Sequence, residues 1–540
     1  MATENSKDEN LSPSDDAEIG ARFYSEDNFG TVRFVGEVPP TKGVWLGVEW
    51  DNPERGKHDG SHNGVRYFQA SSPTGGSFLR PKKADFGVDF LSALQDKYVP
   101  DDKETADVDE KELFIRGAKN QITKVEMVGA VQVAKQQSTF ASLRDVVLRD
   151  MRISRTGTTE LEQKTPGITE LDLSRNLLSS WQVVSELTSQ LKQLRRLSLS
   201  DNRLQIPSTP SSLASCFSNL RELFINYMNL TWAVVTECAP MWPNLKKLHV
   251  CFNKISSIDR SAPGAFETLE LLNLEGNQIS EWKHIMCLSH LPRLDTLILN
   301  SNFLTTVMFE DTPAVTKTQH FASLKSLSIS DNLLSSWRDI AELEKLACLT
   351  ELRLRRNPFM KDIKPEDFRA QLIARLGGLK SFNGSVIIRN ERKSSEIEYM
   401  IKTCKEWLAS GGSRDSNRNK PSAEFQQLHP RYPKLLDKYG IPEDSELIVK
   451  SNTLKEVLIA VTISCPQDPT KRTLTKKLPG TMELQKLKSL IYKLLKIDVS
   501  AQKLTYTSKK LPRQEIKLDN DMRELAFFSI QSGDTILVRW

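Results

Sequence analysis

The 540-residue sequence lacks the features that send a protein into a membrane or a secretory pathway. It contains no run of about 18 apolar residues, so we expect no membrane-spanning segment. Residues 1–16 are polar and acidic, without the apolar core of a signal peptide, and we expect a disordered tail there. The seven cysteines are scattered, and none forms a C-x-x-C pair. Their pattern favours reduced thiols and a cytoplasmic location over a disulfide framework.

Sequence motifs of catalysis are also missing. The chain has no Gly-x-Ser-x-Gly motif, no Cys–His motif and no cluster of metal ligands. The segment from Asp51 to His58 does not match the phosphate-binding motif G-x-x-x-x-G-K-[ST]. Asp51 stands where the first glycine of the motif belongs, and His58 stands where a Ser or Thr belongs. His58 and His62 have i, i+4 spacing, which leaves a metal site as a minor alternative. We therefore expect a binding protein, not an enzyme, with no metal and no cofactor.

Residues 17–90 contain short apolar runs separated by glycine and proline turns, which predicts a small all-β domain. Within it, Gly56–Gly60 places a cation between two glycines, which permit close approach of another backbone. Such a loop, flanked by aromatic rings, suits an extended peptide that ends in a free carboxylate. A plain tight turn is the alternative. The candidate peptide-binding residues are Trp45, Gly56, Lys57, His58, Asp59, Gly60, Phe78 and Arg80.

Three segments of this domain resemble the CAP-Gly family, namely Gly43–Trp50, Gly56–Gly60 and Gly76–Pro81. The resemblance implies a domain that binds acidic C-termini ending in an aromatic residue, as on α-tubulin. The family usually has Asn where this chain has His58. That departure bears on fine specificity and not on the fold.

Between residues 120 and 390 the pattern L-x-x-L-x-L-x-x-N recurs, which is typical of leucine-rich repeats. Nine units are clear from Leu143 onward, and the segment Leu376–Gly384 resembles the C-terminal cap of such arrays. The leucines predict short parallel strands, and each Asn is expected to satisfy backbone groups where the chain leaves the strand. Met151 and Met228 occupy the Asn position in two units, so we expect looser turns there.

A repeat array is a binding scaffold, and the variable strand positions face its concave surface. In the two successive units that begin at Leu220 and Leu245 these positions carry large rings, which predicts an exposed aromatic patch with equivalent residues side by side. Burial of these rings under a neighbouring domain is the alternative. The last strand adds a group of arginines, for which a solvated face is the alternative. The candidate concave residues are Phe224, Tyr227, His249, Phe252, Arg353, Arg355 and Arg356.

The remainder of the chain predicts a helix near residues 395–409, a linker from Gly411 to about Pro442, and a final module. Residues 447–540 follow the order strand, strand, helix, strand, strand and resemble a ubiquitin-like domain. They hold 17 Lys and Arg against 9 Asp and Glu, which favours acidic partners, although the net charge of the whole chain is only +5. The near-balanced total gives no reason to expect a nucleic-acid partner.

The predicted fold class is therefore multidomain: a small all-β CAP-Gly barrel, an α/β leucine-rich-repeat solenoid and an α+β ubiquitin-like β-grasp. The predicted boundaries are 1–16 for the tail, 17–90 for CAP-Gly, 91–119 for a linker, 120–390 for the repeats with their cap, 391–446 for helix and linker, and 447–540 for the ubiquitin-like domain.

This order of modules resembles the tubulin-folding cofactor E family. The resemblance implies a cytoplasmic, cytoskeleton-associated chaperone that binds α-tubulin, assembles or dissociates the α/β-tubulin heterodimer, and works with tubulin-folding cofactors B, C and D. It implies no nucleic-acid or membrane partner. Two alternatives stay open. One is a microtubule-end adaptor, against which the lack of a long heptad coiled coil counts. The other is an adaptor whose ubiquitin-like domain docks on the proteasome.

Overall fold

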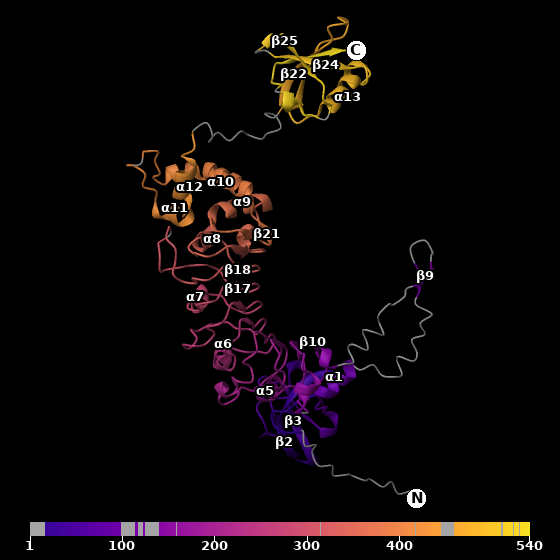
Figure 1. The fold of residues 1–540 in the computed structure, drawn as a ribbon, viewed down its shortest axis with the longest axis vertical. Helices are drawn as coiled ribbons and strands as arrows, with labels where there is room; N and C mark the ends of the chain where they lie inside the picture. The colour runs from indigo at the N-terminus through magenta and orange to yellow at the C-terminus, as the bar shows by residue number, and fades with distance from the viewer. Residues whose placement is uncertain are drawn as a thin grey trace. The chain divides into compact units, whose positions relative to one another are not determined.

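The fold is described from a computed structural model (Figure 1). Its described residues are 17–98, 114–116, 122–124, 140–157, 159–313, 315–415, 417–443, 458–508, 511–521, 523–528 and 530–540. The predicted tail and most of the predicted 91–119 linker lie outside them. The chain divides into two units, Met1–Ile441 and Pro442–Trp540. No helix among the described residues is long and apolar enough to cross a bilayer.

The CAP-Gly domain is an antiparallel sheet with strand order β1-β2-β3-β6. Its core consists of rings and branched side chains on one sheet face, including Phe23, Val32, Leu46 and Trp50. The elements are β1 (Arg22–Ser25), β2 (Asn28–Val38), β3 (Thr41–Trp50), η1 (Pro53–Arg55), β4 (Ser61–His62), β5 (Val65–Arg66), β6 (Gly76–Leu79) and η2 (Pro81–Lys83).

The repeats form one sheet of 11 strands, parallel except for the last pair, as the leucine pattern predicts (Figure 1). The repeat strands are three residues long, and the middle residue, such as Leu197 or Leu272, is buried. The strands are β10 (Asp145–Val147), β12 (Glu170–Asp172), β13 (Arg196–Ser198), β14 (Glu222–Phe224), β15 (Lys247–His249), β16 (Leu271–Asn273), β17 (Thr296–Ile298), β18 (Ser326–Ser328), β19 (Glu351–Arg353), β20 (Ser381–Phe382) and β21 (Ser385–Val386).

Short helices connect the repeat strands, and four of them begin at a tryptophan that packs against the repeat core, namely Trp181, Trp232, Trp282 and Trp337. A Ser or Thr caps several of them; Ser180, for example, accepts a hydrogen bond from the N–H of Val183. The helices are η3 (Phe140–Ser142), α4 (Leu161–Lys164), α5 (Trp181–Gln190), η4 (Pro210–Leu213), α6 (Trp232–Cys238), η5 (Ala239–Met241), α7 (Trp282–Met286), α8 (Trp337–Leu343) and η6 (Pro358–Met360).

The prediction of loose turns at Met151 and Met228 is wrong, because the asparagine of the following repeat bonds to each turn. The side chain of Asn253 accepts hydrogen bonds from the N–H groups of Met228 (2.8 Å) and Leu230 (3.2 Å) and donates to the carbonyl of Ile225 (2.8 Å). Each asparagine thus serves the repeat before its own. Asn176 does the same for Met151, so neither turn loses its hydrogen bonds.

The junction between the CAP-Gly domain and the repeats contradicts part of the predicted linker. Strand β7 (Val88–Asp89) pairs in parallel with β11 (Ile153–Arg155) of the first repeat. Helix α1 (Phe90–Tyr98) follows and buries Phe90, Ala93 and Leu94 in the repeat core. Residues 91–98 are therefore the start of the repeat domain, because an apolar helix face covers its open end.

Polar and aromatic contacts strengthen this junction. Arg152 of the first repeat forms an ion pair with Asp85 at 2.6 Å. The guanidinium of Arg175 lies 5.4 Å from the ring centre of Phe29 in the CAP-Gly domain. The CAP-Gly domain is thus held against the first repeats by a strand pair, a buried helix and charged contacts, and not by a flexible connection.

The predicted linker from Gly411 to Pro442 is also wrong over most of its length. Four helices close the end of the repeat array, and the last two fold back: α11 (Ala423–Leu428) packs on α8 and α12 (Tyr432–Tyr439) on α10 (Arg389–Ala409). Its buried carboxylate Glu396 binds Arg431 and Lys438 of that returning segment at 2.8 Å each. The helices are α9 (Pro365–Arg375), α10 (Arg389–Ala409), α11 (Ala423–Leu428) and α12 (Tyr432–Tyr439). Phe425, Tyr432 and Leu435 are buried, which explains why a polar, proline-containing stretch is ordered.

The second unit is a mixed five-stranded sheet with strand order β23-β22-β26-β24-β25 and one long helix, the ubiquitin-like β-grasp expected. The two strands at its centre, β22 and β26, are parallel. The elements are β22 (Leu458–Ser464), β23 (Leu474–Pro479), α13 (Leu484–Leu495), β24 (Lys503–Ser508), β25 (Leu511–Leu518), η7 (Leu525–Phe528) and β26 (Thr535–Arg539). Strand β25 and the short helix η7 are absent from the predicted order.

Candidate functional site

The Gly56–Gly60 loop is fastened to strand β6 by backbone hydrogen bonds. Lys57 and His58 donate to the carbonyl of Gly76 at 2.7 and 3.1 Å, and Gly76 donates back to His58 at 2.7 Å. A Cβ on Gly56 would lie 2.0 Å from the Thr74 carbonyl oxygen. The glycine is therefore required by packing within the chain itself, where the sequence argument had expected room for a bound peptide. The side chain of Lys57 is left exposed.

His58 closes the loop with its own side chain. Its Nδ1 accepts a hydrogen bond from the N–H of Gly60 at 3.0 Å, the contact by which a short polar side chain stabilises a turn. Burial lowers the pKa of His58, and the nearby His62 and Lys57 act in the same direction. The imidazole is therefore neutral near pH 7, with Nε2 carrying the proton. Asp59 supports the loop through an ion pair with Arg66 at 2.8 Å.

Aromatic rings gather beside this loop, around Phe78. The Phe78 ring centre lies 5.0 Å from that of His58, 5.4 Å from Tyr67 and 5.8 Å from Phe68. Such edge-to-face and tilted arrangements add stabilisation beyond simple burial. The predicted residues His58 and Phe78 are thus brought together, and the exposed Lys57 precedes His58 in the loop.

Trp45 and Arg80 form the second half of the candidate clamp. The Arg80 guanidinium lies 3.8 Å from the ring centre of Trp45 and donates to the carbonyls of Val44 and Lys42 at 3.1 Å each. Strands β3 and β6 pair Gly47 with Phe78, so Trp45, Phe78 and Arg80 share one face of the sheet. The fixed guanidinium of Arg80, the exposed ammonium of Lys57 and the aromatic rings around Phe78 are groups that can bind a C-terminal residue with a free carboxylate and an aromatic side chain.

The concave aromatic patch is present and has the predicted pairing. The rings of Phe224 and His249 stack at 4.1 Å, and those of Tyr227 and Phe252 at 4.7 Å. Tyr227 is 51% exposed and Phe252 40% exposed, so no domain among the described residues buries them. One detail of the prediction is wrong: only the first pair lies in strands. Tyr227 and Phe252 follow their strands, in left-handed turns with φ of 57° and 56°.

The arginine group of the last strand lies apart from these rings, because strands β16, β17 and β18 intervene. Arg356 is paired with Asp331, with an Nη2–Oδ2 distance of 2.7 Å, and Arg355 donates to the carbonyl of Asn383 at 3.1 Å. Arg353 is exposed. Two of the three cations are therefore already engaged within the chain.

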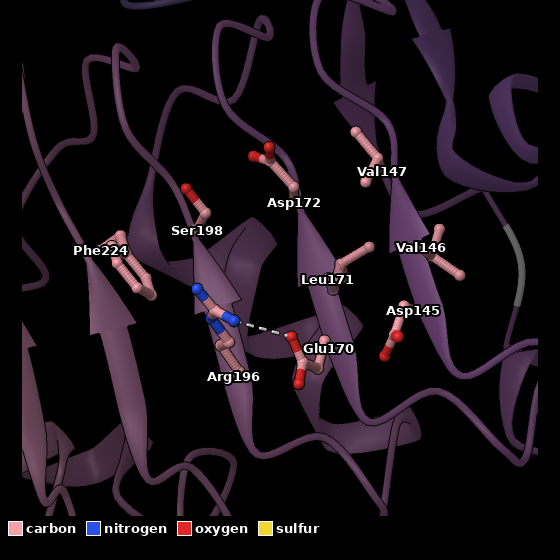
Figure 2. Close-up of a pocket in the computed structure, with 9 residues that line it drawn as sticks. All are labelled: Asp145, Val146, Val147, Glu170, Leu171, Asp172, Arg196, Ser198 and Phe224. Carbon is pink, nitrogen blue, oxygen red and sulfur yellow. Dashed lines mark hydrogen bonds and ion pairs between the residues drawn. The ribbon is translucent and has the colours of Figure 1, made fainter. Parts of the chain in front are cut away.

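A groove on the concave face of strands β10–β14 was not anticipated from the sequence (Figure 2). One hollow of about 280 Å³ is lined by Asp145, Val146, Val147, Glu170, Leu171, Asp172, Arg196, Ser198 and Phe224. A second, of about 500 Å³, is lined by Arg149, Asp172, Ser174, Ser198, Ser200, Asp201, Asn226 and Tyr227. We call the two hollows together the N-terminal groove. The sequence feature that could have predicted this groove is the change from small serines, Ser174, Ser198 and Ser200, to the rings of Phe224 and Tyr227 in the next repeat.

No group of three or more His, Cys, Asp or Glu side chains suited to a metal ion occurs in the part of the chain that the structure describes. The burial of Cys238 and Cys251 raises the pKa of each thiol to about 12, so neither is a reactive thiolate near neutral pH.

Comparison with known proteins agrees with this architecture. The CAP-Gly domain family matches residues 19–84, and leucine-rich-repeat families match residues 193–216 and 243–304. Tubulin-specific chaperone E of Danio rerio is 45% identical over 528 residues, covering 97% of this chain and 99% of that protein. The chain belongs to the tubulin-specific chaperone E family.

Other members of the family align over the same extent. The Homo sapiens tubulin-specific chaperone E is 42% identical over 525 residues, covering 97% of this chain and 98% of that protein. Among solved structures, the C-terminal ubiquitin-like domain of mouse tubulin-specific chaperone E is 44% identical. It covers 15% of this chain and 86% of the solved chain, with a TM-score of 0.15.

Proposed function

We propose that this protein is a non-enzymatic tubulin chaperone that holds α-tubulin at two places, the acidic C-terminal tail and the folded body. The single observation that carries the proposal is the junction between the CAP-Gly domain and the repeats. A strand pair and a buried helix hold the candidate tail clamp and the concave aromatic patch in one unit. Two weak sites in one compact unit can bind the same partner more tightly than either site does alone.

The tail clamp is the CAP-Gly surface around Lys57, Phe78, Trp45 and Arg80. In this proposal the exposed ammonium of Lys57 pairs with a carboxylate of the tail, and the aromatic cluster of Phe78 takes the terminal ring. His58 stands in for the family's asparagine by accepting the N–H of Gly60, so the loop keeps its shape. Its Nε2–H is left to donate toward the peptide.

The concave patch is proposed to contact the folded body of α-tubulin. Stacked, exposed rings at the centre of a surface are the side chains that dominate protein interfaces. By the family resemblance, the same protein would take part in assembling and dissociating the α/β heterodimer with cofactors B, C and D, in the cytoplasm. The ubiquitin-like unit is proposed as a separate docking module, with acidic partners or the proteasome as its targets.

The test uses the full chain and soluble tubulin with and without its C-terminal tail. Lys57→Ala should weaken capture of intact tubulin and leave capture of tailless tubulin unchanged, with Lys97→Ala as an exposed lysine control on α1. The double change Phe224→Ala with Phe252→Ala should weaken capture of tailless tubulin. Equal capture of tailless tubulin by this variant and the wild type, with an unchanged thermal midpoint, would refute the body contact. Binding to assembled microtubules alone would favour the adaptor alternative.

A further inference from the structure

The N-terminal groove ends at an open aromatic face. The Phe252 ring is enclosed on both sides: Tyr227 stacks on one face at an interplanar angle of 4°, and Gly276 lies against the ring, where a Cβ would come within 2.2 Å. Tyr227 is therefore the last ring of the stack. It lines the larger hollow together with Asp201 and Asn226, so its outer face borders the groove.

The groove is also short of cations. Its lining contains the carboxylates of Asp145, Glu170, Asp172 and Asp201 against two guanidinium groups, those of Arg149 and Arg196. Arg196 is already paired with Glu170 at 3.0 Å. Among the described residues, Asp145, Asp172 and Asp201 form no ion pair with Lys, Arg or His. Burial raises the pKa of Asp201, although Arg203, Arg175 and Arg149 oppose that effect. A cation in direct contact with the carboxylate would stabilise its charge further.

Phe224, the other ring that borders the groove, is covered by a cation of the chain itself. The Arg196 guanidinium lies 4.9 Å from the ring centre of Phe224, with Glu170 on its other side (Figure 2). Arg196 is in register with Glu170 and Glu222, and its guanidinium reaches diagonally to Phe224, whose register partner is Ser198.

In the row of Tyr227, Asp201 occupies the equivalent position of the preceding repeat and Arg175 that of the repeat before it. Arg175 is directed to Asp150, at 3.6 Å, and to the Phe29 ring, and among the described residues no Lys or Arg lies over the Tyr227 ring. The Tyr227 ring therefore has no stacked cation of the kind that Phe224 has.

We propose that the N-terminal groove receives an arginine or lysine side chain of the folded tubulin body, stacked on Tyr227 and paired with Asp172 and Asp201. This inference rests on the proposed function. An acidic tail would be repelled by the carboxylates of the groove, so the clamp and the groove recognise oppositely charged parts of one partner. Cation–π contacts and charge-assisted hydrogen bonds supply the affinity.

The decisive variant is Asp172→Asn with Asp201→Asn in the full chain, assayed for capture of tailless tubulin at two salt concentrations. Asn keeps the acceptor that the N–H of Ser174 uses at 2.9 Å, so the turn is preserved. We expect capture to weaken about tenfold or more at low salt, the loss typical of a charge-assisted pair, and its salt dependence to fall. Glu351→Gln, an exposed carboxylate on the last repeat strand and outside the groove, is the control and should change nothing.

A second pair of variants tests the ring. Tyr227→Phe keeps the π face and should bind as the wild type does, whereas Tyr227→Leu should bind several-fold more weakly. Unchanged capture by Asp172→Asn with Asp201→Asn would overturn the inference. If Phe224→Ala with Phe252→Ala still weakened capture in that case, the proposed body contact would stand without it. If neither pair of changes mattered, both the inference and the body contact would be refuted.

Discussion

The C-terminal helical cap should lose stability in mild acid because His429 is buried in its neutral form. Its Nδ1 faces the Tyr399 hydroxyl, and Nε2 lies 3.1 Å from a Glu406 carboxylate oxygen. Burial, with the nearby Arg375, lowers the pKa of His429 from 6.5 to about 4, although Glu406 opposes the shift. The unfolded segment therefore binds the proton more tightly than the folded one.

The sign and size of the effect follow from that difference. Between pH 6.5 and 4 the unfolded state binds more protons, so stability is full above pH 6.5 and is lost as pH falls toward 4. At about 1.4 kcal/mol per tenfold difference in proton affinity, the loss is on the order of 3 kcal/mol. Glu396 adds a second loss at lower pH, because its ion pairs hold its pKa at about 2, below the ordinary 4.5.

Hydrogen exchange of the amides in α10–α12, corrected for intrinsic rates, measures the free energy of opening of this cap at each pH. In the wild type it should fall between pH 6.5 and 4. In His429→Gln, whose amide has no proton to gain, the fall over this interval should be largely absent. The amides of the central repeats give the internal reference. Equal pH dependence in the wild type and the variant would show that His429 does not control this transition.

Three further outcomes are expected. Lys57→Ala should weaken binding of a peptide ending in Glu-Glu-Tyr by about 1–3 kcal/mol in isothermal titration, and equal affinities for peptides with and without the terminal Tyr would contradict the clamp. Gly276→Ala should lower the free energy of urea unfolding by about 1 kcal/mol, because the φ of this residue is 69°. The new Cβ should also displace the Phe252 ring and weaken capture of tailless tubulin, and unchanged capture would mean that the ring stack is dispensable. Deleting residues 442–540 should leave the melting of the first unit unchanged, and a lower midpoint would show that the two units are coupled.

The repeats, the CAP-Gly domain and the ubiquitin-like order were predictable because their signals are local. A leucine every few residues specifies a buried strand whatever its neighbours are, and Leu197 or Leu272 lies where the pattern predicts. The stacking of Phe224 on His249 followed from the repeat period alone, since equivalent positions of adjacent parallel strands must meet. The roles proposed for these rings and for the clamp stay predictions.

Tertiary structure decided what depends on contacts between distant segments. The sequence predicted linkers at residues 91–98 and 411–442, yet the described residues there pack against neighbouring segments, because Leu94, Tyr432 and a few other apolar residues find a core that local sequence does not reveal. The turn at Met228 keeps its hydrogen bonds because Asn253, one repeat later, supplies them. The N-terminal groove likewise exists only where serines of one repeat lie beside rings of the next. The sequence by itself determines the repeat period and the type of each module. The partner of each buried polar or apolar group is decided only in the tertiary structure, because that partner lies far away in the sequence.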